Sequence, residues 1–228
     1  MEDRYSRNVS SITEEENRRL KSFKVCVIGC GGLGGYIIEM LGRIGIGTIT
    51  AVDYDRFEET NLNRQILSDT TNLGQSKSLA ALERMKKVNP EITLNNVDLR
   101  FDSTSGEEII RGSDVVVDAL DNPQGKRLAG DLCAKLNIPL VHGAIAGWYG
   151  QVTTVYPGDK AMDVICKEGT SCGIEKELGN PPFTPAFLAA IQTAEVIKIL
   201  LKKGGTLRNK ILYADLLNME FDIVELKK

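Results

Sequence analysis

The stretch VIGCGGLGGYIIEML, residues 27–41, constrains the fold more than any other, because a short apolar run passes through clustered glycines into a helical pattern. Four glycines form the motif GxGGxG: Gly29, Gly31, Gly32 and Gly34. Glycines permit a tight turn and let backbone N–H groups at a helix start approach phosphate. A second apolar run ends at Asp53, about 20 residues further on, where such domains place an acid against a ribose. The stretch therefore predicts a nucleotide site.

The remaining sequence alternates strand-like and helix-like segments, which is typical of a parallel, doubly wound sheet. A capping box at Thr13–Glu16 predicts a helix as far as Lys21. The expected strands are 23–29, 48–53, 92–99, 114–120 and 139–145, and the expected helices are 35–45, 76–90 and 125–137. We expect a Rossmann-like α/β fold, with a mainly parallel sheet and helices on both faces.

The character of the sequence changes after residue 148. Residues 150–158 alternate like an antiparallel strand, and residues 158–182 form a predicted loop rich in Gly, Cys and Pro. Thr184 and Pro185 resemble a helix cap followed by the preferred proline, and this helix should stop at Gly204 and Gly205. Two antiparallel strands at 210–217 and 219–226 should close the chain. We expect a single domain, 1–228, with an N-terminal helical arm (1–22) and a nucleotide-binding core (23–147).

Composition excludes several classes of function. The 228 residues carry a net charge of −3 without a basic block, so nucleic acid is not an expected partner. The N-terminus is too polar for a signal peptide and no uninterrupted apolar run reaches about 18 residues, so we expect a cytoplasmic protein and no membrane association. Five cysteines without a secretory signal indicate thiols. His142 is the only histidine, and the sequence favours a packed residue at a strand end over a catalytic one.

The glycine motif alone does not distinguish NAD from ATP, so downstream residues must decide. Arg64 and Lys77 follow the second strand, and Asn61 offers further hydrogen bonds. Lys77 falls in the first turn of its predicted helix, where the helix dipole disfavours a cation, which indicates an anionic partner. A triphosphate requires several cations and a metal, whereas a pyrophosphate requires fewer. The pair therefore favours ATP.

The segment DVVVDALDN ends another strand at the same edge of the sheet. Asp121 lies just past the strand and is the predicted Mg²⁺ ligand, because Mg²⁺ takes one or two carboxylates together with phosphate oxygens. Asp118, at the strand end, has a predicted structural role. Asn122 should order the loop, and Asp55, beside Asp53, belongs to the predicted nucleotide site.

Six short motifs, RYSRN, GCGGLG, VDYD, NLNRQ, GQSK and LDN, resemble in order and spacing those of the family of ThiF, MoeB and HesA. Its members are bacterial relatives of ubiquitin-activating enzymes that adenylate the C-terminal glycine of a small ubiquitin-like sulfur carrier. The resemblance implies that the glycine turn around Gly32 holds ATP and Asp53 the ribose. It places Asn61, Arg64 and Lys77 on the phosphates and Asp121 on Mg²⁺. It also implies a homodimer in which Arg7 of each subunit reaches the other's site.

The resemblance implies further partners. The carrier should end in Gly-Gly and bind the part 148–228, which should also contribute to the dimer, and sulfur should come from a separate donor protein. Many relatives bind zinc through two CxxC pairs, but Cys166 and Cys172 do not match that spacing, so zinc is not expected. In some members a loop cysteine links covalently to the carrier, which makes Cys172 a candidate nucleophile and Cys166 a weaker one. Trp148 is expected in the core or at the dimer contact.

Three alternatives remain open at this point. An NAD-dependent oxidoreductase would use the glycines and Asp53 but leave Arg64, Lys77 and Asp121 without a role. A non-catalytic subunit that docks a ubiquitin-like partner would not need these charged residues. An enzyme of the same class could instead adenylate a peptide C-terminus or a tRNA-bound carboxylate.

Overall fold

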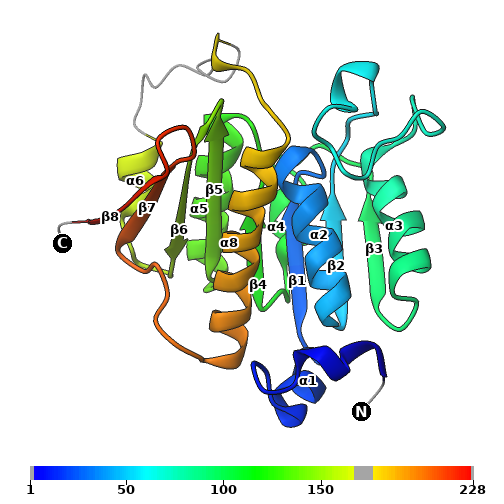
Figure 1. Cartoon of the computed structure of the whole chain (residues 1–228). Coiled ribbons are helices and arrows are strands. Elements are labelled where there is room, and N and C mark those ends of the chain that lie inside the picture. Colours follow the sequence, from blue (N-terminus) through cyan, green and yellow to red (C-terminus); the bar gives the residue numbers. More distant parts are fainter. Residues whose placement is uncertain (1–2, 167–176, 227–228) are drawn as a thin grey trace.

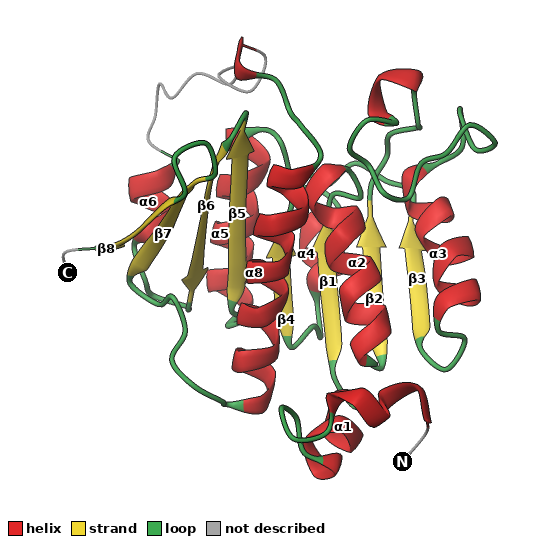
Figure 2. Ribbon diagram, in the orientation of Figure 1, coloured by secondary structure: helices red, strands yellow, loops and turns green. Residues whose placement is uncertain are grey.

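The computed structural model describes residues 3–166 and 177–226, which contain one eight-stranded sheet in the order β3-β2-β1-β4-β5-β6-β7-β8. Figure 1 shows the sheet from one side, with helices in front of it and behind it. The first five strands are parallel and the last three are antiparallel, as Figure 2 also shows. The predicted Rossmann-like class with an antiparallel extension is confirmed.

The parallel strands are short, and all but the edge strand β3 are largely buried. Their bounds are β1 Lys24–Ile28, β2 Thr48–Val52, β3 Thr93–Val97, β4 Val115–Asp118 and β5 Leu140–Ala146. The chain runs outward from β1 through β2 to β3 and then crosses to β4 on the other side of β1. This reversal creates a crevice at the carboxyl ends of the strands, where nucleotide ligands bind in folds of this kind.

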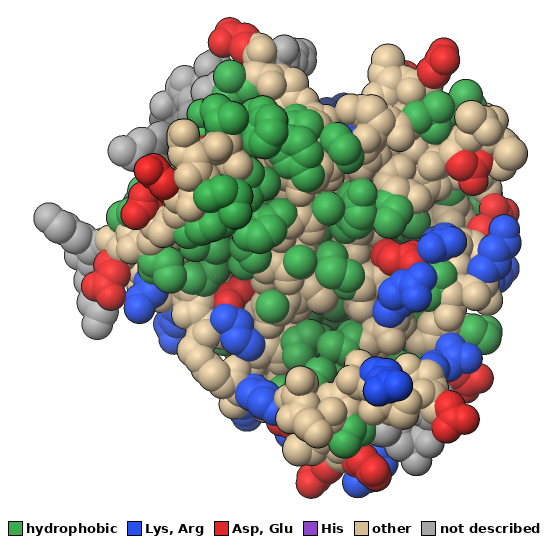
Figure 3. All heavy atoms as spheres, viewed as in Figure 1, with side chains coloured by type: hydrophobic (Ala, Val, Ile, Leu, Met, Phe, Trp, Pro, Cys, Tyr) green, Lys and Arg blue, Asp and Glu red, His purple; other side chains and the backbone are tan. Residues whose placement is uncertain are grey.

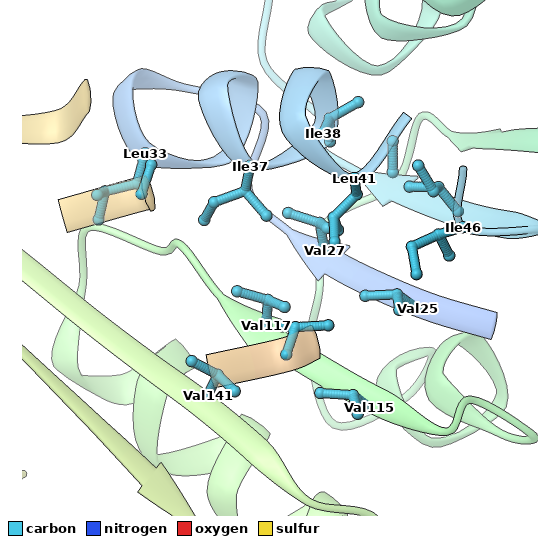
Figure 4. Close-up of a cluster of buried hydrophobic side chains, with 14 of the residues drawn as sticks. Val25, Val27, Leu33, Ile37, Ile38, Leu41, Ile46, Val115, Val117 and Val141 are labelled. Carbon is cyan, nitrogen blue, oxygen red and sulfur yellow. The ribbon is translucent and has the colours of Figure 1, made fainter. Parts of the chain in front are cut away.

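Helices cover both faces of the sheet and build one core on each side. One core packs α2 (Gly32–Ile44), α3 (Lys77–Val88) and α8 (Phe183–Leu201) against the sheet. The other involves α4 (Gly106–Ile110), α5 (Pro123–Leu136) and α6 (Ala161–Ile165). Strand residues alternate between the cores, with Val25 and Val27 facing α2 in Figure 4, whereas Cys26 and Ile28 belong to the opposite core.

The antiparallel strands are β6 (Tyr149–Val155), β7 (Lys210–Asp215) and β8 (Glu220–Glu225). The N-terminal arm contains a 3₁₀ helix at Asp3–Asn8 and α1 at Glu14–Leu20, where the predicted capping box on Thr13 is present. It lies at the end of the sheet opposite the carboxyl ends of the parallel strands (Figure 1).

Several sequence-based expectations were wrong. Helix α8 begins at Phe183 rather than after a Thr184 cap, because the Thr184 hydroxyl donates to the Gly147 carbonyl (2.7 Å). Helix α2 begins at Gly32, inside the glycine turn, and α6 interrupts the expected 158–182 loop. Trp148 is 42% exposed in the single chain, so it does not lie in the core, and its expected place at a dimer contact stays a prediction. The 3₁₀ helix at Glu59–Asn61 and α4 were not anticipated.

Helix α8 is long and apolar enough to cross a membrane by length and composition alone. However, 56% of its apolar window is buried inside the protein, where it packs against α2 and the sheet. This is the pattern of a core helix.

Candidate nucleotide site

The site is built where three neighbouring parallel strands end in register. Ile28, the last residue of β1, pairs with Val52 of β2 on one side and with Asp118 of β4 on the other. The backbone N–H groups of Gly29 and Ala119 continue the ladder, donating to Val52 and Ile28 respectively. The glycine turn, Asp53 and the loop that bears Asp121 therefore emerge side by side.

The four glycines of the turn have two different roles. Gly29 has a φ of +98°, and a Cβ there would lie 2.6 Å from the Ala119 carbonyl oxygen, while a Cβ on Gly34 would overlap the backbone of Gly29. These two are required by packing. At Gly31 and Gly32 a Cβ would meet side chains only, at 3.6 and 3.5 Å, so packing does not require glycine at these two positions. We call the surface at Gly31 and Gly32 the cradle.

The cradle presents the N-terminus of α2. Its N-cap, Gly31, makes no side-chain capping hydrogen bond. The first N–H groups of a helix lack intrahelical acceptors and carry a partial positive charge, which suits a phosphate.

Asp53 fastens the turn to the end of β2. Its carboxylate accepts from the Cys30 N–H (2.7 Å) and the Asp55 N–H (2.9 Å). Burial raises its pKa, although both hydrogen bonds and the Lys77 charge oppose that shift. Asp53 therefore shapes the turn itself, and its contact with a ribose stays a prediction.

Lys77 pairs with a carboxylate of its own chain, so its predicted contact with phosphate stays a prediction. It is the first residue of α3, its side chain is nearly buried, and its Nζ lies 3.3 Å from Asp55 Oδ2. Half-exposed Asp55 thus holds Lys77 near the turn, because the Asp53 carboxylate binds the Asp55 backbone.

Asn61 and Arg64 lie on the segment between β2 and α3. The Asn61 side chain accepts from the Glu58 N–H (3.1 Å), and Arg64 donates to the Thr60 carbonyl (3.1 Å) and to Asn63 (2.9 Å). The Arg64 side chain is the third nearest neighbour of a Cβ placed on Gly32. The structure therefore brings Arg64 to the cradle, whereas Asn61 mainly stabilises its own turn.

Asp121 and Asn122 follow β4. Asn122 caps α5 by accepting from the Gly125 N–H (2.8 Å), which confirms that it orders the loop. Asp121 is exposed, and its carboxylate lies 3.4 Å from the Asn122 side-chain amide. Within residues 3–166 and 177–226 no group of three or more Asp, Glu, His or Cys side chains is arranged to hold a metal. A single exposed carboxylate suits Mg²⁺, which takes its remaining ligands from water and phosphate.

Behind this loop lies a buried polar cluster that sequence analysis only partly anticipated. Asp118 accepts from His142 Nδ1 (2.6 Å) and from Lys126 Nζ (3.3 Å). The structural role of Asp118 and the packed position of His142 are confirmed by their complete burial. Lys126 was missed, although its position one turn into a helix that follows a buried aspartate was a usable signal.

Gln65 was also missed. It is 5% exposed, its Oε1 has no hydrogen-bond partner among residues 3–166 and 177–226, and its amide is the nearest group to a Cβ placed on Gly31. An unpaired buried acceptor is uncommon and costs free energy, which places Gln65 among the site residues. The motif NLNRQ contains it.

Arg7 does not lie near its own chain's cradle. Its segment, Asp3–Asn8, is anchored by Tyr5, whose ring is the nearest group to Gly45 and whose hydroxyl accepts from Asn89. Gly45 ends the 13-residue α2, so about 20 Å separates it from the cradle.

Of the two candidate nucleophiles, Cys172 and Cys166, the structure describes only Cys166. Cys172 lies outside the described residues. Cys166 is 5% exposed, and burial raises its pKa, so its thiol is a poor nucleophile in this conformation.

The fold and this site define an α/β nucleotide-binding protein whose glycine turn, flanking cations and exposed acid meet at one edge of the sheet. The ThiF family model matches residues 5–228, and the chain belongs to the ThiF family. The family expected from the six motifs is therefore confirmed.

The relatives agree with that assignment. The chain is 35% identical to the SAMP-activating enzyme E1 of Haloferax volcanii, over 97% of this chain and 84% of the relative. It is 34% identical to a sulfur carrier protein adenylyltransferase of Thermus thermophilus, over 96% and 85%. It is also 34% identical to the adenylyltransferase and sulfurtransferase MOCS3 of Caenorhabditis briggsae, over 93% of this chain but only 54% of that protein. The predicted enzyme class, adenylyltransferase, is that of these relatives.

Solved structures share the fold. MccB of E. coli, in a complex with MccA-N7isoASN, superimposes with a TM-score of 0.85 over 100% of this chain and 72% of that chain, at 23% identity. MccB with ATP superimposes with a TM-score of 0.82 at 22% identity.

Proposed function

We propose that this protein uses ATP to adenylate the C-terminal glycine carboxylate of a small ubiquitin-like sulfur carrier, releasing pyrophosphate. The observation that carries the proposal is the convergence of the α2 N-terminus, Arg64, the Lys77–Asp55 pair and exposed Asp121 at one edge of the sheet. A hydride-transferring enzyme has no need of these charged groups. The names of the relatives, a SAMP-activating enzyme and a sulfur carrier protein adenylyltransferase, support the same reaction.

The site fits ATP and Mg²⁺. The cradle at Gly31 and Gly32 would receive phosphate, and the Gln65 amide N–H, which is the group nearest to Gly31, could donate to it. Asp53 would meet the ribose, and Asn61, Arg64, Lys77 and Asn122 would border the phosphates. Asp121 would hold Mg²⁺, which supplies positive charge between phosphate oxygens when bound.

The reaction requires no general base. A C-terminal carboxylate has a pKa of about 3.5 and is ionised at neutral pH, so it is a nucleophile without activation. The difficulty is to bring one anion to another, which the protein meets with fixed positive charge. Arg64 and Lys77 supply that charge from this chain. His142 is buried against Asp118 and takes no part in the chemistry.

We place the carrier on an apolar face formed by Trp148, which directly precedes β6, and by side chains of α8 and β8: Phe183, Phe187, Phe221 and Ile223. These side chains are 37–59% exposed, and Figure 3 shows hydrophobic atoms gathered over this region. The Trp148 and Phe183 rings pack at 4.4 Å, and those of Phe187 and Phe221 at 5.6 Å. Pro185, next to this face in α8, is also the nearest group to a Cβ on Gly32. Buried Pro185 therefore places the start of α8, which bears Phe183, beside the cradle, so a carrier seated on the face would have its C-terminus near the nucleotide.

We further propose a cytoplasmic homodimer in which Arg7 acts in the partner's site. The distance of Arg7's segment from its own cradle supports action in trans. Cys172 is the proposed residue for any covalent link to the carrier, and a separate protein would donate sulfur.

The decisive experiment is ATP–pyrophosphate exchange with a carrier that ends in Gly-Gly, and with the same carrier lacking those two glycines. We expect exchange only with the intact carrier, and its loss in Asp121→Ala. Glu108→Ala, which removes an exposed acid from α4, is the matched control and should retain full exchange.

The alternatives give different results in the same assay. ATP binding without exchange in the presence of any carrier would contradict the proposed substrate, and exchange with a short peptide alone would indicate peptide adenylation. Tighter binding of NAD than of ATP would favour an oxidoreductase.

A further inference from the structure

The proposed reaction leaves unexplained a buried charged cluster centred on Asp118, Lys126 and His142. Asp118 and His142 are fully buried, and Lys126 is 8% exposed. Lys126 Nζ also donates to the Gly143 carbonyl (2.8 Å), and the Gln151 amide lies 3.4 Å from His142 Nε2. Gln192 of α8 donates to the Asp118 carbonyl (3.0 Å). Burying charge is costly, so a cluster of this kind needs a reason.

The cluster links the two ends of the loop that bears Asp121. Asp118 is the last residue of β4, where the loop starts, and Lys126 lies in the first turn of α5, where the loop has ended. Their ion pair joins the two ends. Asp118 Oδ1 also accepts from the Leu120 N–H (3.0 Å) within the loop. Residues 119–122 are thus held at both ends and from inside.

The surroundings fix the charges of the cluster. Burial alone would raise the pKa of Asp118, but the Lys126 charge and the His142 hydrogen bond hold that pKa below its usual range. Burial and the Lys126 charge lower the pKa of His142, which leaves the imidazole neutral. The nearby Cys133 and Cys166 thiols have raised pKa values, mainly through burial, and stay neutral. One carboxylate and one ammonium therefore balance.

We propose that Asp118, Lys126 and His142 are positioning residues that fix the 119–122 loop so that Asp121 is pre-set to hold the metal beside the cradle. This inference rests on the proposed metal role of Asp121. Residues that orient a metal ligand from behind typically change metal affinity or activity by about 10–100-fold when they are altered. The chain's own geometry makes Lys126 the residue whose loss would release the loop most directly.

The test compares Lys126→Met, which removes the charge, with Lys126→Arg, which retains it. Arg127→Met is the matched control, because Arg127 is the next residue of α5 but bonds to Cys166 and Asp163. The first measurement is the Mg²⁺ concentration that gives half-maximal ATP binding by calorimetry. We expect Lys126→Met to raise it about tenfold. The two other variants should remain within about twofold of the wild type, and an unchanged midpoint in Lys126→Met would overturn the inference.

A second measurement needs neither ATP nor metal. His142 is the only histidine, so one imidazole resonance reports the cluster by NMR. We expect this imidazole to stay neutral in the wild type and to become protonated at higher pH in Lys126→Met, where the Asp118 charge loses its partner. The Leu120 amide should exchange with solvent about tenfold faster in that variant, in line with a released loop. An unchanged exchange rate of the Leu120 amide would contradict the proposal that the cluster fixes the 119–122 loop.

The double variant Asp118→Asn, Lys126→Met guards against misfolding, because it leaves no unpaired buried charge. It should fold and still show the raised Mg²⁺ midpoint, and a wild-type midpoint would refute the positioning role. The two proposals fail separately. Wild-type protein without carrier-dependent ATP–pyrophosphate exchange would contradict the proposed function. The Mg²⁺ midpoints of the variants and the hydrogen exchange of the Leu120 amide test the role of the cluster, and neither measurement needs a carrier.

Discussion

The parallel and antiparallel parts of the sheet expose different chemistry. In the parallel part both faces are covered by helices, and the polar side chains gather where the strands end. In the antiparallel part β8 is exposed on both sides, and aromatic side chains remain on the surface. The contrast teaches that small ions and nucleotides suit loops fixed by a rigid core, whereas a protein partner suits the open face of a sheet.

The largest expected effect lies in the glycine turn. Gly34→Ala should lower the free energy of unfolding by about 4 kcal/mol or more, because its Cβ would overlap the backbone of Gly29. Gly31→Ala should change stability by less than about 1 kcal/mol but weaken ATP binding, since its Cβ meets only a side chain. Chemical denaturation and calorimetric titration with ATP measure both quantities. If the two variants had equal free energies of unfolding, the distinction between glycines that packing requires and glycines that border the cradle would be wrong.

Arg64→Ala should act on chemistry without affecting the fold. We expect exchange to fall about 100-fold or more, because a fixed positive charge near the phosphates is lost. The free energy of unfolding should change by less than about 1 kcal/mol, since the hydrogen bonds of Arg64 to the described residues are with Thr60 and Asn63 of its own exposed segment. A large drop in melting temperature would assign Arg64 to the framework instead.

Phe221→Ser should affect only the carrier. We expect the KM for carrier to rise about tenfold, because the ring belongs to the apolar face, while ATP affinity stays unchanged. Val224→Ser is the matched control, because Val224 is equally exposed but points to the opposite side of β8. An identical loss in both variants would remove the apolar face as the docking surface.

The smallest effect concerns pH. His142 is neutral in the folded protein because burial lowers its pKa, whereas an unfolded chain binds a proton below pH 6.5. The free energy of unfolding should therefore fall on acidification below pH 6.5, by up to about 1.4 kcal/mol per pH unit. The contribution of ionised Asp118 to the free energy of unfolding is lost only at more acidic pH, because its pKa is lowered from the usual value of 3.8. His142→Gln should flatten the slope just below pH 6.5 in plots of the free energy of unfolding against pH, and an unaltered slope would show that His142 is not its source.

Sequence reasoning succeeded where local pattern determines structure. The glycine turn after β1 and the places of Asp53 and Asp118 at the ends of neighbouring strands follow from residue type and spacing, and both are present, although β2 ends one residue before Asp53. Asn122 was expected to order the loop, but the cap that it forms on α5 was not predicted. It failed where tertiary contacts decide. The Thr184 hydroxyl donates to the Gly147 carbonyl instead of capping its own helix, and Trp148 lies on the surface, where its ring packs beside Phe183.

The unpredicted site residues share one cause. Lys126 and Gln65 are polar residues that burial makes important, and a sequence does not show which polar side chains will be buried. Lys126 is identified by its contacts with Asp118 of β4 and the Gly143 carbonyl of β5, which are neighbouring strands. Gln65 is identified by the cradle beneath it. Both depend on contacts between segments that are distant in the chain.

Strand β8 has a consequence for the behaviour of the protein at high concentration. It pairs with β7 on one side and is the last strand of the sheet, so its other edge offers backbone groups to any extended chain. Glu220, Asp222 and Glu225 lie along this edge strand, between and beside the apolar Phe221, Ile223 and Val224. Their like charges repel a second copy of the strand, which discourages copies from stacking edge to edge into aggregates. The acids thus keep the molecule dispersed while the aromatic rings beside them stay uncovered.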